Sequence, residues 1–328
     1  MTILSMLAKT TCAMSVAALG LSSVTASAEG FPSKPITIVA PYVPGGTVDA
    51  LARTLAVHLR EEFGQQVVVE NRAGASGGIG AAYVAAAPAD GHTLLLTNSS
   101  LIVNPMVLKE KPPFNLQKDF TPIGQVAIAP LVFVVGSSSG IGSVQEFIAL
   151  AKGRPEKVTF GVGGFGSGGH LAMESFNVET GTRIPMVLYR GGANALVDIA
   201  GGQVTAMMEP ALTTVPYVTS GRMRAIAVTG DRRSELLPQV PTLAEAGVKN
   251  VDFVSWYGLW APAQLPASVT QRVQAALAKV LGRADMREWL VKQGLIASTA
   301  MGPAFAKLID DERIRYAEVV EKARIEPK

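Results

Sequence analysis

Short apolar, β-branched runs alternate with helix-forming segments along this chain, and this alternation limits the fold more than any other feature. Most of the runs are apolar on both faces, which is typical of parallel strands covered by helices. Strands are expected at 36–40, 67–70, 93–97, 131–135, 157–160, 186–189, 204–208 and 224–229. Strand and helix in alternation predict layers of α/β type.

The clearest helix is expected at 47–63, where apolar residues recur at three-and-four spacing and form one stripe. Thr47 is predicted as its N-cap, and Asp49 lies in the first turn, where its charge suits the helix dipole. Gly64 is expected to end the helix. Further helices are expected at 80–87, 144–152, 169–180, 193–200, 267–281, 285–293 and 303–322.

Composition narrows the classes of function. Hydrophobic residues make up 48% of the 328 residues, which is enough for a sizeable core. Lys plus Arg number 29 against 26 Asp plus Glu, and no basic run appears, so nucleic acid is not an expected partner. Three His and one Cys cannot build a Cys/His metal cluster, so we expect neither a metal nor a cofactor.

The first 28 residues have the layout of a secretory signal peptide. Lys9 precedes an apolar stretch, and Ala26-Ser27-Ala28 forms an A-x-A cleavage pattern. The apolar stretch is shorter than the roughly 20 residues that a spanning helix needs. We therefore expect cleavage after Ala28 and export of a soluble chain.

Three glycine-rich turns, at 41–47, 161–170 and 190–193, each follow an expected strand and precede an expected helix. Glycine lets the backbone approach a ligand, and the N-terminus of the next helix favours an anion. Ligands of open α/β sheets lie beyond the carboxyl ends of the strands. A tight turn alone explains one such loop. Three of them, with few charged side chains, favour a carboxylate site made largely of backbone.

Catalytic motifs in the same region are weak. The segment 161–166 fits G-x-G-x-x-G, but that match is unspecific alone, and NAD is scarce outside the cytoplasm. Ser167 has Phe165 where a nucleophile elbow needs glycine. His58 and His92 are interpreted as surface residues. With no nucleophile and base at a recognisable spacing, we expect no enzyme.

Blocks in a shared order resemble the substrate-binding proteins of tripartite tricarboxylate transporters, the Bug family. The resemblance covers nearly the whole chain after the signal peptide. Among its blocks are Pro44-Gly45-Gly46, Val69-Glu70-Asn71-Arg72, Pro88-Ala89-Asp90-Gly91, Tyr189-Arg190-Gly191, Pro241-Thr242-Leu243-Ala244-Glu245-Ala246-Gly247 and Trp256-Tyr257-Gly258.

The resemblance implies an α/β, two-lobed periplasmic-binding-protein fold (type II-like). Each lobe is expected to be a mostly parallel sheet flanked by helices, with a ligand cleft between the lobes. Lobe 1 is expected to comprise 29–130 plus 255–328, and lobe 2 to comprise 131–254. A receptor of this kind captures a small mono- or dicarboxylate, in some cases with an aromatic or apolar body. It delivers the ligand to membrane permease subunits, and we expect a monomer.

The resemblance also implies the ligand-binding residues, which pinch a carboxylate between loops of the two lobes. They are Tyr42, Val43, Gly45, Gly46, Thr47, Asn98, Ser99, Ser100, Gly164, Gly166, Ser167, His170 and Gly191. Val162 and Gly163 stand where many relatives have two serines, which puts the carboxylate network of lobe 2 in doubt.

Three side chains at these loops have two interpretations each. Phe165 is suited to stack on an apolar or aromatic ligand body. Arg190 is suited to grip a second carboxylate, or forms an exposed ion pair. Glu209 meets a ligand amine, as an acid does in some relatives, or is a surface or hinge carboxylate. His170 is interpreted as capping or packing its loop, and Tyr257 as core or hinge.

Two other functions stay open at this point. One is a secreted α/β enzyme that acts on a carboxylate. The other is a binding protein of the same fold that presents its ligand to a sensor kinase.

Overall fold

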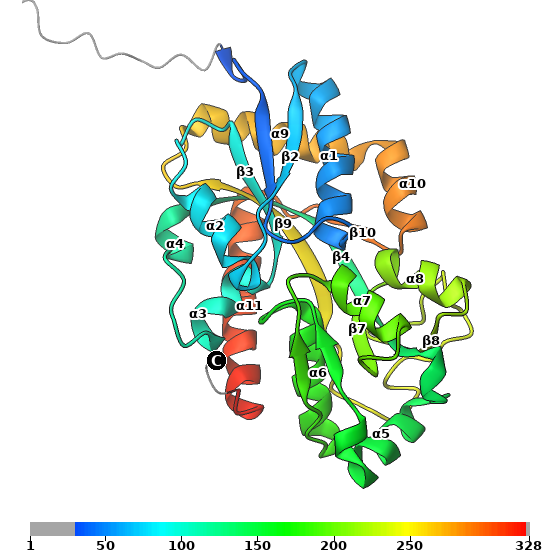
Figure 1. Ribbon diagram of the computed structural model, residues 1–328. Helices are drawn as coiled ribbons and strands as arrows, with labels where there is room; N and C mark the ends of the chain where they lie inside the picture. The colour runs from blue at the N-terminus through cyan, green and yellow to red at the C-terminus, as the bar shows by residue number, and fades with distance from the viewer. Residues whose placement is uncertain (1–29, 326–328) are drawn as a thin grey trace, which may run out of the picture. The chain divides into compact units, whose positions relative to one another are not determined.

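The computed structural model describes residues 30–325, and residues 32–325 form one compact unit (Figure 1). The predicted signal peptide and its cleavage site lie outside the described residues. Within the described part, no helix has both the length and the apolar character needed to cross a membrane.

A mixed sheet, ten-stranded within the described residues, runs through this unit in the order β2-β1-β3-β9-β4-β7-β5-β6, with β8 and β10 also paired to β4. The strands are β1 (Ile36–Ala40), β2 (Val67–Asn71), β3 (Thr93–Asn98), β4 (Phe120–Gly136), β5 (Phe160–Val162), β6 (Met186–Leu188), β7 (Ala206–Pro210), β8 (Met223–Val228), β9 (Val254–Pro262) and β10 (Ile296–Ala297). The expected α/β class is therefore confirmed.

Parallel pairing joins β1 to β2 and β3, and joins β5 to β6 and β7. Both sets are linked by β4, a 17-residue strand whose predicted part covered only 131–135. From Phe120 to Pro130, β4 pairs antiparallel with β9, and from Leu131 onward it pairs antiparallel with β7. β9 was not predicted at all. The two antiparallel strands thus connect two parallel sets.

The eight predicted helices lie close to their expected positions, whereas α3, α4 and α8 were not predicted. α1 packs against β2 and α9 (Figure 1). The helices are α1 (Thr47–Phe63), α2 (Gly78–Ala85), α3 (Ser100–Val107), α4 (Leu116–Asp119), α5 (Val144–Gly153), α6 (Gly168–Thr180), α7 (Gly192–Ala200), α8 (Ala211–Thr219), α9 (Ala267–Gly282), α10 (Ala284–Lys292) and α11 (Gly302–Lys322). Short 3-10 turns include η2 (Ala75–Gly77).

Local signals explain α1, with one correction. Gly64 ends it in a left-handed conformation with φ of 63°, and its amide donates to the Arg60 carbonyl. Thr47 was predicted as the N-cap, but it is the first helical residue. Extended Gly46 (φ −87°, ψ 173°) is the N-cap, and no side chain caps this end. The first turn of α1 therefore keeps free amide groups.

Aromatic residues fill the core in two clusters. Phe133 of β4 meets Phe147, Phe160 and Phe176 edge-to-face, with ring centroids 4.9, 5.9 and 5.5 Å away. Such pairs add about 0.5–1.5 kcal/mol each beyond the area that they bury.

The second cluster lies where β9 meets α11. Phe305, which is fully buried, contacts Trp260 and Trp256, with ring centroids 5.1 and 5.8 Å away. Trp256 also donates from Nε1 to the Tyr316 hydroxyl at 2.9 Å. This cluster attaches the C-terminal helix to the strand that the sequence pattern did not reveal.

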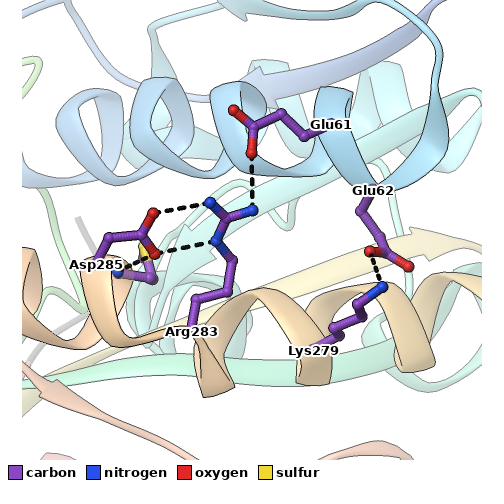
Figure 2. Close-up of polar contacts among 6 residues, drawn as sticks. Glu61, Glu62, Lys279, Arg283 and Asp285 are labelled. Carbon is purple, nitrogen blue, oxygen red and sulfur yellow. Dashed lines mark hydrogen bonds and ion pairs between the residues drawn. The ribbon is translucent and has the colours of Figure 1, made fainter.

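Ion pairs join the end of α1 to α9 and α10 (Figure 2). Arg283 binds Glu61 at 2.7 Å and holds both oxygens of Asp285 at 3.0 and 2.8 Å. Lys279 binds Glu62 at 2.7 Å. The Arg283 guanidinium lowers the pKa of Asp285 to about 2. Because these ion pairs lie at the surface, they add little to stability. Their main effect is to specify how the end of α1 meets α9 and α10.

Candidate functional site

A small cavity of about 40 Å³ lies where the N-termini of α1, α6 and α7 converge. The loops after β1, β5 and β6 contribute to it, together with residues of β3, β7 and β9. Its lining is Tyr42, Val43, Gly46, Thr47, Val48, Asn98, Gly163, Ser167, Gly169, Gly191, Gly192, Glu209, Ser255 and Tyr257.

The loop before α1 is held by Asp49. Its carboxylate accepts hydrogen bonds from the Gly45 amide at 3.1 Å and from Asn71 Nδ2 at 3.0 Å, and it pairs with Arg53. Burial opposes ionisation of Asp49, but bonds from Arg53, the Gly45 amide and Asn71 keep its pKa below the ordinary value. Gly45 has φ of 88°, which favours glycine. These contacts hold the loop in one conformation.

The loop before α6 is ordered by its own residues. Ser167 caps the helix by accepting from the His170 amide at 3.3 Å, and the His170 ring accepts from the Gly166 amide at 3.1 Å through Nδ1. His170 is fully buried and does not line the cavity. Its position supports the interpretation of His170 as a residue that packs the loop.

Two glycines near the start of α7, Gly192 and Gly163, allow neighbouring groups to approach the backbone closely. A Cβ at Gly192 would lie 2.6 Å from the Glu209 carboxyl carbon, and a Cβ at Gly163 would lie 2.7 Å from the Gly192 nitrogen. A side chain at Gly163 would therefore require that backbone to move. The carboxyl group of Glu209 thus lies directly at the N-terminus of α7.

Two tyrosines complete the wall of the cavity. Tyr42 donates from its hydroxyl to Asn98 Oδ1 at 2.9 Å, and the same oxygen accepts from the Ser100 amide at 3.0 Å. Tyr257 of β9 is buried, as expected, but it also lines the cavity, which the sequence analysis had not favoured. Burial raises the pKa of both tyrosines, so both stay neutral hydrogen-bonding groups.

Three hydrogen bonds join the loops on either side of the cavity. Ser99 donates from Oγ to the Gly166 carbonyl at 2.9 Å. The Phe165 amide donates to Ser76 Oγ at 3.0 Å, and the Val43 amide donates to the Arg190 carbonyl at 3.4 Å. Ser76 holds φ of 52°, a strained conformation for a residue with a side chain. These bonds close the loops over the cavity.

The structure brings together half of the residues that were predicted to bind the ligand. Those at the cavity are Tyr42, Val43, Gly46, Thr47, Asn98, Ser167, Gly191 and Glu209. Those in the same loops that do not line it are Gly45, Ser99, Ser100, Gly164, Phe165, Gly166, His170 and Arg190. Ligand contact stays a prediction for all of them.

Phe165 and Arg190 lie instead along a neighbouring groove of about 630 Å³, with Ser76 and Lys109 also in its lining. Phe165 is buried and meets the His170 ring edge-to-face, with centroids 5.2 Å apart. The Arg190 side chain is exposed. A ligand confined to the small cavity would therefore not reach either side chain.

Several lining residues were missed: Val48, Gly163, Gly169, Gly192, Ser255 and Tyr257. The glycines adjoin predicted residues; Gly163 directly follows β5, and Gly169 and Gly192 lie at the starts of α6 and α7. Ser255 and Tyr257 could not be predicted, because their position depends on β9.

The histidines outside the site need one correction. His92 was interpreted as a surface residue, but it is 8% exposed and accepts from the Ser33 amide at 3.2 Å through Nε2. Its backbone carbonyl accepts from the Thr37 amide of β1 at 2.8 Å, which holds it beside the first strand. Among residues 30–325, no cluster of three or more His, Cys, Asp or Glu is arranged to hold a metal ion.

The comparison with protein families matches residues 51–325 to the model TctC, described as the tripartite tricarboxylate transporter family receptor. The chain belongs to this receptor family. The resemblance found in the sequence is thereby confirmed. The receptor is 35% identical over 295 residues to protein BugT of Bordetella pertussis, with 90% of each chain covered. It is 34% identical over 316 residues to a protein of Pseudomonas sp. strain P51 encoded between tcbD and tcbE, with 94% of each covered.

Solved structures agree with the fold. A Rhodopseudomonas palustris protein, Rpa4515 with adipate, has a TM-score of 0.88 and 33% identity, covering 91% of the receptor and all (100%) of that chain. The periplasmic binding protein BugD has a TM-score of 0.86 and 30% identity, covering 91% and 100%. MatC of R. palustris with bound malate has a TM-score of 0.84 and 28% identity, covering 88% and 100%.

Proposed function

We propose that this receptor captures a small carboxylate in the cavity and delivers it to the membrane subunits of a tripartite transporter. The observation that carries the proposal is the convergence of the N-termini of α1, α6 and α7 on one cavity. Each N-terminus presents free amide groups and about half a positive charge, so together they favour an anion.

Two solved relatives support a carboxylate as the ligand, since one is described with adipate and the other with malate. In the part of the chain that the structure describes, no lysine, arginine or histidine lines the cavity. Backbone amides and the hydroxyls of Ser167, Ser255 and Tyr257 would therefore supply the donors, since the Tyr42 hydroxyl already donates to Asn98. A site of this kind is suited to binding and lacks a paired base and nucleophile.

The ligand must open the loops to enter, because about 40 Å³ is room for a few water molecules only. We propose that 29–130 plus 255–328 and 131–254 form two lobes that move apart about β4 and β9. The change of partners along β4 supports this hinge, since Pro130 still pairs with Val254 of β9 and Leu131 already pairs with Pro210 of β7. The bound ligand then shifts the population toward the closed form.

We also propose that the receptor is a periplasmic monomer whose signal peptide is cleaved after Ala28. The A-x-A pattern before Glu29 supports this location. Permease subunits would be its partners. Deleting the gene in its host should abolish uptake of the ligand. Unchanged uptake with lost gene induction would instead indicate presentation to a sensor kinase.

Thermal unfolding of the purified protein with adipate, malate, benzoate and glutamate tests the binding function. A ligand at 100 times its Kd should stabilise the protein by about 2.7 kcal/mol, which raises Tm by about 5 °C at this size. Mass spectrometry of the same samples should find the carboxylate unchanged. Steady conversion to a product would overturn a purely binding role.

A matched pair of variants tests the cavity itself. A Cβ at Gly46 meets only the Val43 carbonyl oxygen, at 4.0 Å, and Gly46 lines the cavity. Gly46→Leu should therefore fold and lose ligand stabilisation. Gly153→Leu, at the exposed end of α5 where a Cβ meets nothing within 4 Å, should keep it. Full stabilisation of Gly46→Leu would place the ligand elsewhere.

A further inference from the structure

Among residues 30–325, Glu209 is the only charged residue that lines the cavity. It stands at the end of β7, one residue before Pro210. The site proposed for a carboxylate therefore already contains a carboxyl group, placed where three helix N-termini favour an anion. The protonation state of Glu209 in the presence of a ligand carboxylate therefore decides how the ligand is held.

The surroundings of Glu209 supply no cation. Tyr42 faces it from the loop after β1, and Tyr257 faces it from β9, both as neutral phenols. α7 contributes Gly192, and its acid, Asp198, accepts from the Tyr189 hydroxyl at 2.6 Å.

The other elements packed around Glu209, which are α6, β4 and α8, also place no cation beside it. α6 contributes Gly169, and its His170 contacts the Gly166 amide and lies 3.8 Å from Glu174. β4 opposes Glu209 with apolar Val132, and α8 begins with Ala211. Among residues 30–325, no lysine, arginine or histidine forms a hydrogen bond or ion pair with Glu209. Burial raises its pKa to about 7.

Ionising two carboxyl groups in one small site is energetically unfavourable, because each negative charge raises the pKa of the other group. A neutral carboxyl group, by contrast, is a hydrogen-bond donor that a ligand carboxylate can accept from. We propose that the receptor takes up one proton on Glu209 as it binds its carboxylate, and that the neutral Glu209 donates a hydrogen bond to the ligand. This proposal rests on the proposed function.

The proposal fixes the sign of the pH dependence. In the free protein Glu209 loses its proton above about pH 7, and in the complex it keeps the proton to a higher pH. Affinity should therefore be constant below about pH 7 and fall by up to about tenfold per pH unit above it. Binding should take up about 0.9 proton at about pH 8 and about 0.1 proton at about pH 6.

Calorimetric titration of the full receptor with adipate and with malate, in phosphate and in Tris, measures the proton uptake. Glu209→Gln should bind with pH-independent affinity and take up no proton, because its amide stays neutral and still donates. Glu156→Gln, which changes an exposed acid outside the site, should behave as the wild type does. An infrared difference spectrum of the wild type at about pH 8 should gain a protonated-carboxyl band on binding, whether or not the variants fold.

Three results would overturn the proposal. Wild-type binding without proton uptake at about pH 8 would overturn this proposal and leave the proposed function intact. Proton uptake that persists in Glu209→Gln would do the same. Binding of glutamate alone, with no proton uptake, would show that Glu209 pairs with a ligand ammonium group. Failure of adipate, malate, benzoate and glutamate to bind at every pH would overturn the proposed function, and is distinguishable from the other results.

Discussion

Ser99→Ala removes one hydrogen bond that closes the loops over the cavity and leaves the lining untouched. Ser99 is 1% exposed, and its hydroxyl donates to the Gly166 carbonyl at 2.9 Å. A bond of this kind contributes about 0.5–1.5 kcal/mol net. If the free protein is mainly open, that energy belongs to the bound form alone. The affinity should then fall by about two- to tenfold, since about 1.4 kcal/mol corresponds to a factor of ten.

The assay is calorimetric titration with the carboxylate that gives the largest thermal shift. Ser298→Ala is the matched control, because its buried hydroxyl donates to Gln125 Oε1 at 2.6 Å, away from the cavity. The control should lose stability and keep its affinity. Unchanged affinity of Ser99→Ala would refute the reasoning, because closure by this bond would then be no part of ligand capture. An equal loss in both variants would show a general effect of destabilisation.

Three further predictions concern stability and are checked by urea unfolding. Phe305→Ala should cost about 3–5 kcal/mol, because the ring is fully buried against Trp256 and Trp260; a cost below about 1 kcal/mol would contradict that packing. Gly64→Ala should cost about 1–2 kcal/mol, because φ is 63° there; a more stable variant would contradict the left-handed helix end. Asp285 has a folded pKa of about 2, below its unfolded value near 3.9, so its contribution is complete above about pH 4 and lost as the pH falls toward about 2. Asp285→Asn should therefore differ most from the wild type near neutral pH, and a difference independent of pH would argue against the pairing with Arg283.

The sequence predicted the long amphipathic helices well, since their spacing and end signals act locally. α1 begins and ends at the predicted residues, with Gly46 replacing Thr47 as the cap. α3 and α8 were missed because each contains a proline, Pro105 and Pro216, which is normally a helix breaker.

The antiparallel strands were harder to predict. Most of β4 and all of β9 were not predicted, because Pro122, Gly124 and Gly258 interrupt their apolar residues. Neither strand alternates regularly between apolar and polar residues. What holds them in place is pairing with each other across the sheet. Local patterns carry no information about such distant partners.

The site was predicted at the level of loops rather than atoms. Glycines after strands located the turns that carry Gly46, Ser167 and Gly191. Sequence could not tell which residues of a loop face inward, so Phe165 and Arg190 were placed at a cavity that they do not line. The loop's own hydrogen bonds, such as that between Gly166 and His170, decide this orientation.

The place of β9 in the sheet has a consequence for the order of folding. β9 lies between β3 and β4, although both precede it in the chain by a long stretch. A chain released N-terminus first therefore carries two unpaired strand edges, of β3 and of the first part of β4, until Val254–Pro262 emerges. Such edges invite pairing with other chains. The segment from β5 to β8 is contiguous and can assemble earlier, so the N-terminal strands are the last to be completed and the most dependent on protection during synthesis.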